Sequence, residues 1–157
     1  MARIDDRQAT FAGVLLLANR MQTTYDAAIE EVTLKQWLAL VVVASLPRPV
    51  PSTAEVARAL GTTHQNMRKL LAALADRGLL EITPSPTDRR ARRVDITPAA
   101  HALFDRLGPT GDRLLDDLFA DVAPDDLSTC LRVLDTMSLA LTGDSLRPPE
   151  PETERTD

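Results

Sequence analysis

The fold is decided by residues 62–97, which read TTHQNMRKLLAALADRGLLEITPSPTDRRARRVDIT. From Met67 to Leu74 the apolar residues recur at spacings of three and four, which predicts one face of a helix. From Leu80 to Ile82, and again from Val94 to Ile96, apolar and polar residues alternate, which predicts two β-strands. The segment between these strands is rich in turn-forming residues and arginine. We therefore expect a helix followed at once by a β-hairpin with a long, basic tip.

Capping boxes predict where the helices of this region begin, because a Ser or Thr is followed three residues later by Glu or Gln. The boxes are Thr33–Gln36, Ser52–Glu55 and Thr62–Gln65. The second opens a short helix that Gly61 ends, and the third opens the helix that ends at Gly78. Two helices separated only by a glycine and a cap form a helix-turn-helix unit. With the hairpin attached, the predicted fold class is mainly α with a small β-hairpin wing, a winged helix-turn-helix.

Further helices flank this lobe. Apolar residues at helical spacing predict a helix over Phe11–Ile29. Thr97-Pro98 restarts a helix, with threonine as the cap, and Gly108-Pro109 should kink or interrupt it. A last helix begins at Pro124, where two acids follow the proline and suit the positive end of the helix dipole. Residues 144–157 show no apolar period, so we expect a disordered acidic tail.

The composition is that of an ordinary globular chain. It has 157 residues, of which 44% are hydrophobic, enough for one domain with extensions. The single cysteine, Cys130, excludes an internal disulfide, and its place in an apolar stripe predicts a buried thiol. His64 and His101 lie far apart in the sequence, which argues against a structural zinc site. No apolar stretch reaches the roughly 20 residues of a membrane span, and the acidic N-terminus is unlike a signal peptide. These features predict a cytoplasmic protein.

The charge is unevenly distributed along the chain. The net charge is −5, which by itself argues against a nucleic-acid partner. However, the segment from Arg48 to Arg106 has ten basic and six acidic residues, against eight and seventeen in the rest. A local basic patch can coexist with an acidic body, so the middle segment is where a nucleic-acid partner would be sought.

The helix after Gly61 has the side chains that base readout requires. If Met67 and Leu70 face the core, Gln65 and Lys69 point the opposite way at 100° per residue. Asn and Gln can pair with adenine, and Arg or Lys with guanine. The alternative is an exposed face that is merely solvated. The candidate DNA-binding residues of this helix are Thr62, Thr63, His64, Gln65, Asn66, Arg68 and Lys69.

The predicted wing places four arginines within five residues, in the stretch Asp88–Arg93. Folding gains nothing from their mutual repulsion, whereas the phosphates of a duplex would relieve it. The alternative is a solvated charge cluster. The candidate DNA-binding residues of the wing are Asp88, Arg89, Arg90 and Arg92.

At this point the sequence resembles the MarR family of bacterial transcriptional regulators. The resemblance is carried by Asp88-x-Arg90-x-x-x-Val94-x-Ile96-Thr97, which fits the family's wing signature, and by the order of helices, helix-turn-helix and wing. It covers roughly residues 11–141. It implies a symmetric homodimer whose first and last helices interlock. It also implies recognition helices in successive major grooves of a pseudo-palindrome, with Arg90 in the minor groove and Asp88 orienting it.

The resemblance also suggests how the chain is divided. We expect an N-terminal dimerisation helix over residues 1–32 and a DNA-binding lobe over 33–97. C-terminal dimerisation helices are expected over 98–143, ahead of the tail at 144–157. The flanking helices carry wide apolar stripes that a small winged helix alone could not cover, which independently predicts a dimer.

Many members of that family release DNA when a small aromatic or lipophilic ligand binds between the dimer region and the DNA-binding lobe. Segments that flank such a pocket carry Met21, Tyr25, Trp37 and Phe104 here. Because the chain has only five aromatic residues, these side chains could equally be ordinary core. The sequence therefore leaves ligand sensing open.

The function predicted is a DNA-binding transcriptional regulator, in the form of a repressor acting as a homodimer. Its partners would be double-stranded DNA, a second copy of the chain and a small effector, with no membrane. No nucleophile–base pair and no glycine-rich phosphate loop is visible, so we expect no enzyme activity, no cofactor and no metal. The main alternative is a winged helix kept as a protein-interaction module, without sequence-specific DNA binding.

Overall fold

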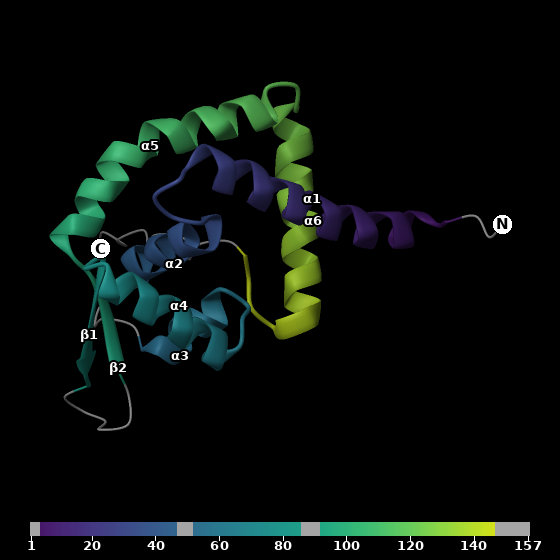
Figure 1. Cartoon of the computed structure of the whole chain (residues 1–157). Coiled ribbons are helices and arrows are strands. Elements are labelled where there is room, and N and C mark those ends of the chain that lie inside the picture. The colour runs from purple at the N-terminus through teal and green to yellow at the C-terminus, as the bar shows by residue number, and fades with distance from the viewer. Residues whose placement is uncertain (1–3, 47–51, 86–91, 147–157) are drawn as a thin grey trace, which may run out of the picture. The chain divides into compact units, whose positions relative to one another are not determined.

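In the computed structural model, residues 4–46, 52–85 and 92–146 are described (Figure 1). The chain divides into two compact units, residues 1–114 and 115–157, which are described separately. Within the described ranges the elements are six helices and one two-stranded antiparallel sheet, a mainly α fold with a hairpin wing. The predicted fold class is thereby confirmed.

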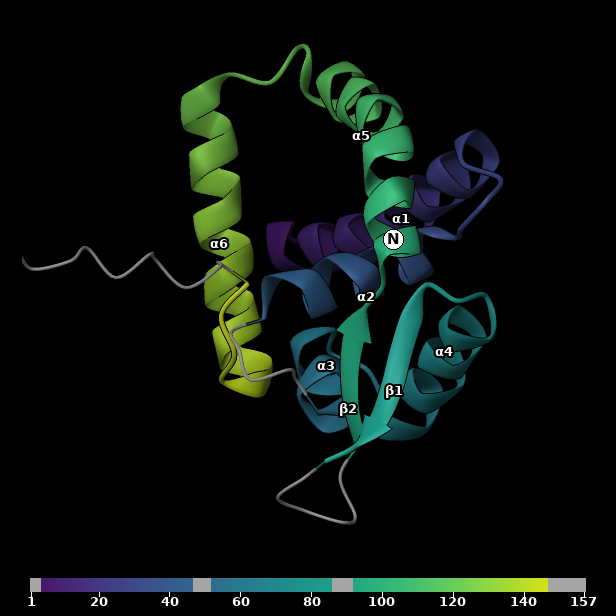
Figure 2. The same ribbon diagram turned by 90° about the vertical axis from the view of Figure 1, so that its left-hand side faces the viewer.

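The first unit contains the winged helix-turn-helix. Its helices are α2 (Leu34–Ser45), α3 (Thr53–Ala59) and α4 (His64–Asp76), followed by strands β1 (Leu80–Pro84) and β2 (Arg92–Ile96). The helix α4 packs against α3 and β1, and β2 contacts α2 and α3 (Figure 2). The two strands that the alternating pattern predicted form this hairpin, in which Leu80 pairs with Ile96 and Ile82 with Val94.

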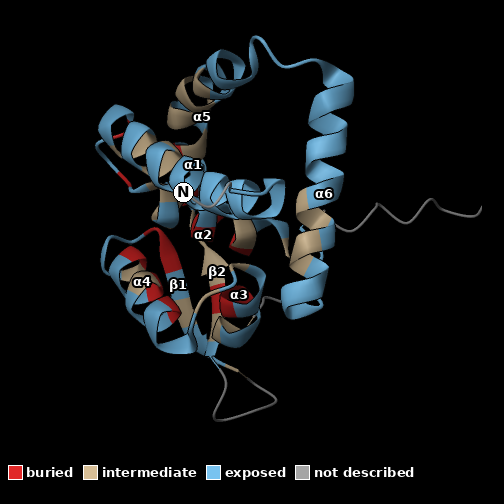
Figure 3. Cartoon of the chain, turned by 90° about the vertical axis from the view of Figure 1, so that its right-hand side faces the viewer, coloured by how far each residue is buried: buried red, intermediate tan, exposed pale blue. Residues whose placement is uncertain are grey.

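Among the described residues of this unit, every residue that is buried as a whole is apolar. Figure 3 shows these buried residues in red. The core lies where α2, α3, α4, the hairpin and the start of α5 (Pro98–Phe119) meet. Its largest fully buried side chains are Leu40, Val56, Met67, Leu71, Leu74 and Val94. The core therefore contacts one face of α4 and leaves its other face in solvent.

Two of the three predicted capping boxes form as expected. The Thr33 hydroxyl accepts from the Gln36 amide at 3.2 Å, and the Thr33 amide donates to Gln36 Oε1 at 3.1 Å. At Ser52, the hydroxyl accepts from the Glu55 amide at 3.2 Å, and the Ser52 amide donates to Glu55 Oε2 at 2.7 Å. These bonds satisfy amide groups that would otherwise lack a partner in the first turn of a helix.

The third prediction was wrong by one residue. The N-cap of α4 is Thr63 rather than Thr62, and its hydroxyl accepts from the Asn66 amide at 3.3 Å without a reciprocal bond. The reason lies in the preceding turn, where Gly61 adopts a φ of +59°. The Thr62 amide then donates to the carbonyl of Ala57 at 3.0 Å and closes the end of α3. Thr62 thus belongs to the end of one helix and cannot cap the next.

The first helix, α1 (Asp6–Ala28), begins five residues earlier than predicted. A capping box that the apolar pattern did not reveal starts it, because the Asp5 carboxylate accepts from the Gln8 amide at 2.8 Å. At the other end, the Leu34 amide donates to Asp26 Oδ1 at 2.6 Å, which ties the helix to α2. In the single chain α1 buries none of its residues.

The helix α5 starts as predicted, since the Thr97 hydroxyl accepts from the Ala100 amide at 3.3 Å and donates to the Gly78 carbonyl at 2.7 Å. It then continues through Gly108-Pro109 to Phe119, so the predicted interruption does not occur. Proline removes a single helix hydrogen bond, and Arg113, Leu114 and Leu115, about one turn further on, favour helix.

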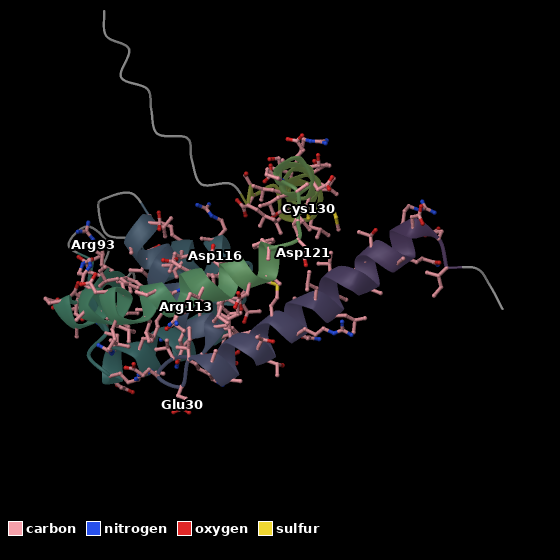
Figure 4. The ribbon with its side chains drawn as sticks, turned by 90° about the horizontal axis from the view of Figure 1, so that it is seen from above. Glu30, Arg93, Arg113, Asp116, Asp121 and Cys130 are labelled. Carbon is pink, nitrogen blue, oxygen red and sulfur yellow. The ribbon has the colours of Figure 1, made fainter. Side chains whose placement is uncertain are left out.

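The second unit contains the end of α5 and the helix α6 (Pro124–Thr142). This helix begins at the proline as predicted, and its first turn holds two acids. It buries no residue in the single chain, and Cys130 is exposed (Figure 4). The expectation of a buried thiol is therefore wrong for the single chain as far as its described residues extend.

The predicted disordered tail is ordered at its start. The Asp135 carboxylate accepts from the Ser145 hydroxyl at 2.7 Å and from the Leu146 amide at 2.8 Å, which holds residues 144–146 against α6. Residues 147–157 lie outside the described residues. None of the described helices is long and apolar enough to cross a membrane.

Candidate nucleic-acid interface

The exposed face of α4 displays the residues that the sequence predicted to read DNA. On its inner face Met67, Leu71 and Leu74 are buried. Its outer face is polar along the first two turns, and only Thr62, in the turn before the helix, is partly covered. The exposed members of the predicted set are Thr63, His64, Gln65, Asn66, Arg68 and Lys69. The structure therefore brings these six side chains together on one solvent-facing surface.

When the residues of α4 are placed on a helical wheel at 100° per residue, its exposed surface divides into an outermost strip and two flanks. Gln65 and Lys69 are outermost, opposite the buried residues. His64 and Arg68 lie on one flank, and both line a groove with residues of the hairpin. Asn66 lies on the other flank, which faces α2 and lines a different cavity. The predicted DNA-reading residues thus do not occupy equivalent positions.

The groove beside the hairpin has a volume of about 310 Å³. The His64 ring and the Thr53 hydroxyl lie close together in it, with Nε2 and Oγ1 at 3.4 Å. Its residues come from α3, α4 and both strands, so no short motif in the sequence could have shown it. The groove is lined by Thr53, His64, Arg68, Leu71, Ala72, Ile82 and Arg92.

Most of the predicted wing residues cannot be placed. Asp88, Arg89 and Arg90 lie outside the described residues. Arg92 is exposed at the start of β2, where it pairs with Pro84. The next residue, Arg93, is half-buried and forms an isolated bridge with Ser52, which links the hairpin to the start of α3 (Figure 4).

The residues predicted to flank a ligand pocket are partly brought together. Trp37 of α2 and Phe104 of α5 make an edge-to-face contact with ring centroids 5.1 Å apart. Tyr25 packs against the same core, and its hydroxyl is buried without a hydrogen-bond partner among the described residues. This burial raises the pKa of the Tyr25 hydroxyl above its usual 10. Met21 is half-exposed on α1.

A further cavity, of about 500 Å³, was not predicted from the sequence. It lies between α2, the turn after α3 and the Asn66 flank of α4. No aromatic residue lines it, and its apolar residues had been assigned to helix packing, so the sequence held no signal for it. It is lined by Lys35, Leu38, Leu60, Gly61, Thr62, Asn66, Met67 and Leu70.

Away from α4, an ion pair fastens α5 to the loop between α1 and α2. Arg106 donates to Glu31 from Nη2 at 2.6 Å and from Nε at 3.2 Å. The hydrogen bond from Arg106 holds the pKa of Glu31 below its ordinary value of 4.5, and Arg77 at the end of α4 contributes in the same direction. The described residues contain no group of His, Cys, Asp and Glu that could hold a metal ion.

Comparisons with known proteins agree with this geometry. Residues 31–91 match the model of the MarR family. The PcaV transcriptional regulator of Streptomyces coelicolor, solved in complex with its natural ligand, is 20% identical with a TM-score of 0.77, and the match covers 89% of this chain and 99% of that chain.

Two other solved structures are similar. MepR of S. aureus, solved with DNA, is 18% identical with a TM-score of 0.74, and the match covers 82% of this chain and 95% of that one. BpsR of Bordetella bronchiseptica, whose DNA binding is regulated by 6-hydroxynicotinic acid, is 24% identical with a TM-score of 0.70, over 80% of this chain and 91% of that one. At these identities the likenesses show the fold.

Proposed function

We propose that this chain, whose residues 31–91 match the model of the MarR family, is a sequence-specific DNA-binding transcriptional regulator. The observation that carries the proposal is the outer face of α4. Six polar side chains are exposed there on a helix that the core holds rigidly by its other face. Such a helix can enter a major groove, and the basic hairpin beside it can reach an adjacent groove.

The regulator is proposed to act as a homodimer on a pseudo-palindromic operator. Each flanking helix leaves large apolar side chains in solvent, among them Phe11 and Leu16 on α1 and Leu131 and Leu141 on α6. Soluble monomers rarely expose apolar surface on this scale. A second copy of the chain would cover it, and two recognition helices would then read half-sites about 10 base pairs apart.

We further propose that the dimer is a repressor released by a small aromatic or lipophilic ligand. A site for such a molecule is supported by the edge-to-face pair of Trp37 and Phe104 and by the buried Tyr25 hydroxyl, which no described residue hydrogen-bonds. Trp37 fluorescence during a screen of aromatic acids and phenols would detect binding. If the Trp37→Phe variant releases DNA in response to the same ligands as the unmodified protein, Trp37 is only a core residue.

The decisive experiment selects bound duplexes from a random-sequence library and measures their affinity at two salt concentrations. A preferred, roughly symmetric sequence is expected. Gln65→Ala should relax the preference at one position per half-site and weaken operator binding by roughly 1–3 kcal/mol. Arg90→Ala should weaken binding to all duplexes by the same factor. It should also reduce the dependence of affinity on salt concentration by the equivalent of about one phosphate contact. A chain that binds no duplex at low salt would be a protein-interaction module instead.

A further inference from the structure

The groove between α4 and the hairpin has an apolar floor and a basic rim. Leu71 is buried and Ile82 half-buried at its base. Arg68 of α4 and Arg92 of β2 are both exposed and both line the groove. Two cationic side chains from different elements therefore border one hollow of about 310 Å³.

These cations are not neutralised within the described part of the chain, where neither Arg68 nor Arg92 has an ion-pair partner. On the α3 side of the groove, the Glu55 carboxylate accepts a hydrogen bond from the Ser52 amide at 2.7 Å. The Thr53 hydroxyl and the His64 ring, 3.4 Å apart, add polar groups at the α3 side of the groove. The groove therefore offers positive charge and hydrogen-bonding groups to an anion.

Its position between the two DNA-contacting parts decides which anion this is. If α4 lies in a major groove and the hairpin tip in the adjacent minor groove, one sugar-phosphate strand must separate them. That strand has to cross between α4 and the hairpin, where this groove lies. We propose that the groove seats a backbone phosphate of that strand, held by Arg68 and Arg92 with Thr53 and His64. This inference rests on the proposed function.

The inference changes the role of one predicted residue. The sequence placed Arg68 among the side chains that discriminate bases. In the structure it shares the hairpin flank of α4 with His64, away from the outermost positions of Gln65 and Lys69. Arg68 thus positions the protein on the duplex and carries no direct sequence information. Base discrimination falls to Gln65 and Lys69.

The test compares Arg68→Ala and Thr53→Val with Lys69→Ala, a matched control that removes a neighbouring cation from the outermost face. Each protein is measured against its selected operator and against a random-sequence duplex over a range of salt concentrations. Arg68→Ala should lower the affinity of the protein for both duplexes by about tenfold. It should also lower the salt slope by about one phosphate contact and leave the selected sequence unchanged. Lys69→Ala should change the selected sequence.

Duplexes with single uncharged methylphosphonate linkages locate the phosphate directly. At one linkage in each half-site, the methylphosphonate should lower the affinity of the unmodified protein. The same substitution should leave the affinity of Arg68→Ala unchanged. A changed selected sequence with an unchanged salt slope in Arg68→Ala would overturn the inference, as would equal sensitivity of both proteins at every linkage. Absence of all DNA binding by the unmodified chain would contradict the proposed function itself, and this inference with it. Circular dichroism confirms that each variant is folded.

Discussion

Gly61 determines where α4 begins. Its φ of +59° lets the chain turn after α3, so that the Thr62 amide bonds to Ala57 and Thr63 becomes the cap of α4. A side chain other than glycine rarely adopts this conformation. One residue therefore sets which threonine caps the following helix.

Gly61→Ala is accordingly expected to destabilise the protein by about 1 kcal/mol. A Cβ at this position would meet no atom within 4 Å, so the cost comes from the backbone alone. Urea unfolding would measure it. Gly111→Ala is the control, because Gly111 lies inside α5 with open space around its Cα and should be neutral or stabilising. Equal effects at both positions would contradict this explanation.

The pair of Glu31 and Arg106 should make stability depend on pH. Because the folded pKa of Glu31 lies below 4.5, the contribution of the pair is present above that pH and is lost as the pH falls through the lowered pKa. Arg106→Ala should therefore lower the melting temperature slightly at neutral pH and have no effect in acid. Both partners are exposed, so the change should be small.

Melting temperatures from about pH 7 to about pH 3 would measure this difference. The control is Arg113→Ala on the same helix, because Arg113 contacts Pro109 and Thr110 and no acid among the described residues. A difference between Arg106→Ala and the unmodified chain that persists unchanged in acid would show that Arg106 acts through packing instead.

At the scale of the elements, α5 is unusual because it is continuous through Pro109. The proline cannot donate to the carbonyl one turn earlier, and the neighbouring glycines favour helix poorly. The helix nevertheless persists, and its first part is anchored by the buried residues Ala100 and Leu103. Packing of that first part thus outweighs a local preference against helix.

Pro109→Ala should consequently stabilise the protein, by about 1–3 kcal/mol, because it restores the hydrogen bond and removes the clash with the preceding turn. Pro109 is exposed, so no core contact is lost. Pro98→Ala serves as the control, since a proline at the first position of a helix is favourable and its removal should not stabilise. Destabilisation by Pro109→Ala would mean that the proline has a structural role.

At the scale of the whole molecule, the distribution of burial separates the chain into two kinds of helix. The winged helix-turn-helix buries its apolar residues within one chain. The helices α1 and α6 bury none, although both carry large apolar side chains. These helices therefore need a partner surface, and the proposed homodimer supplies one.

Leu131→Asp should dissociate or unfold the protein, because it places a charge in the apolar stripe of α6, where Leu131 is 44% exposed in the single chain. Sedimentation equilibrium at micromolar concentration measures the assembly state. Arg132→Asp, one residue along the same helix, should remain dimeric. A well-folded monomer of the unmodified chain at that concentration would exclude the proposed dimer.

The sequence by itself determined the elements of this protein and their order. Helical spacing, capping residues and strand alternation act over a few residues, so they are visible without knowledge of the fold. The caps at Thr33 and Ser52 and the two strands of the hairpin all follow from such local patterns, whereas the pairing of Leu80 with Ile96 came from the structure. The polar outer face of α4 could be predicted for the same reason.

Only the tertiary structure decided what depends on residues distant in sequence. The contact of Trp37 with Phe104, the cavity beside Asn66 and the groove shared by Thr53 and Arg92 each join several elements. The exposure of Cys130 likewise depends on whether another element covers α6. Contacts of this kind arise when elements pack, because packing brings together side chains whose separation along the chain carries no signal of their proximity.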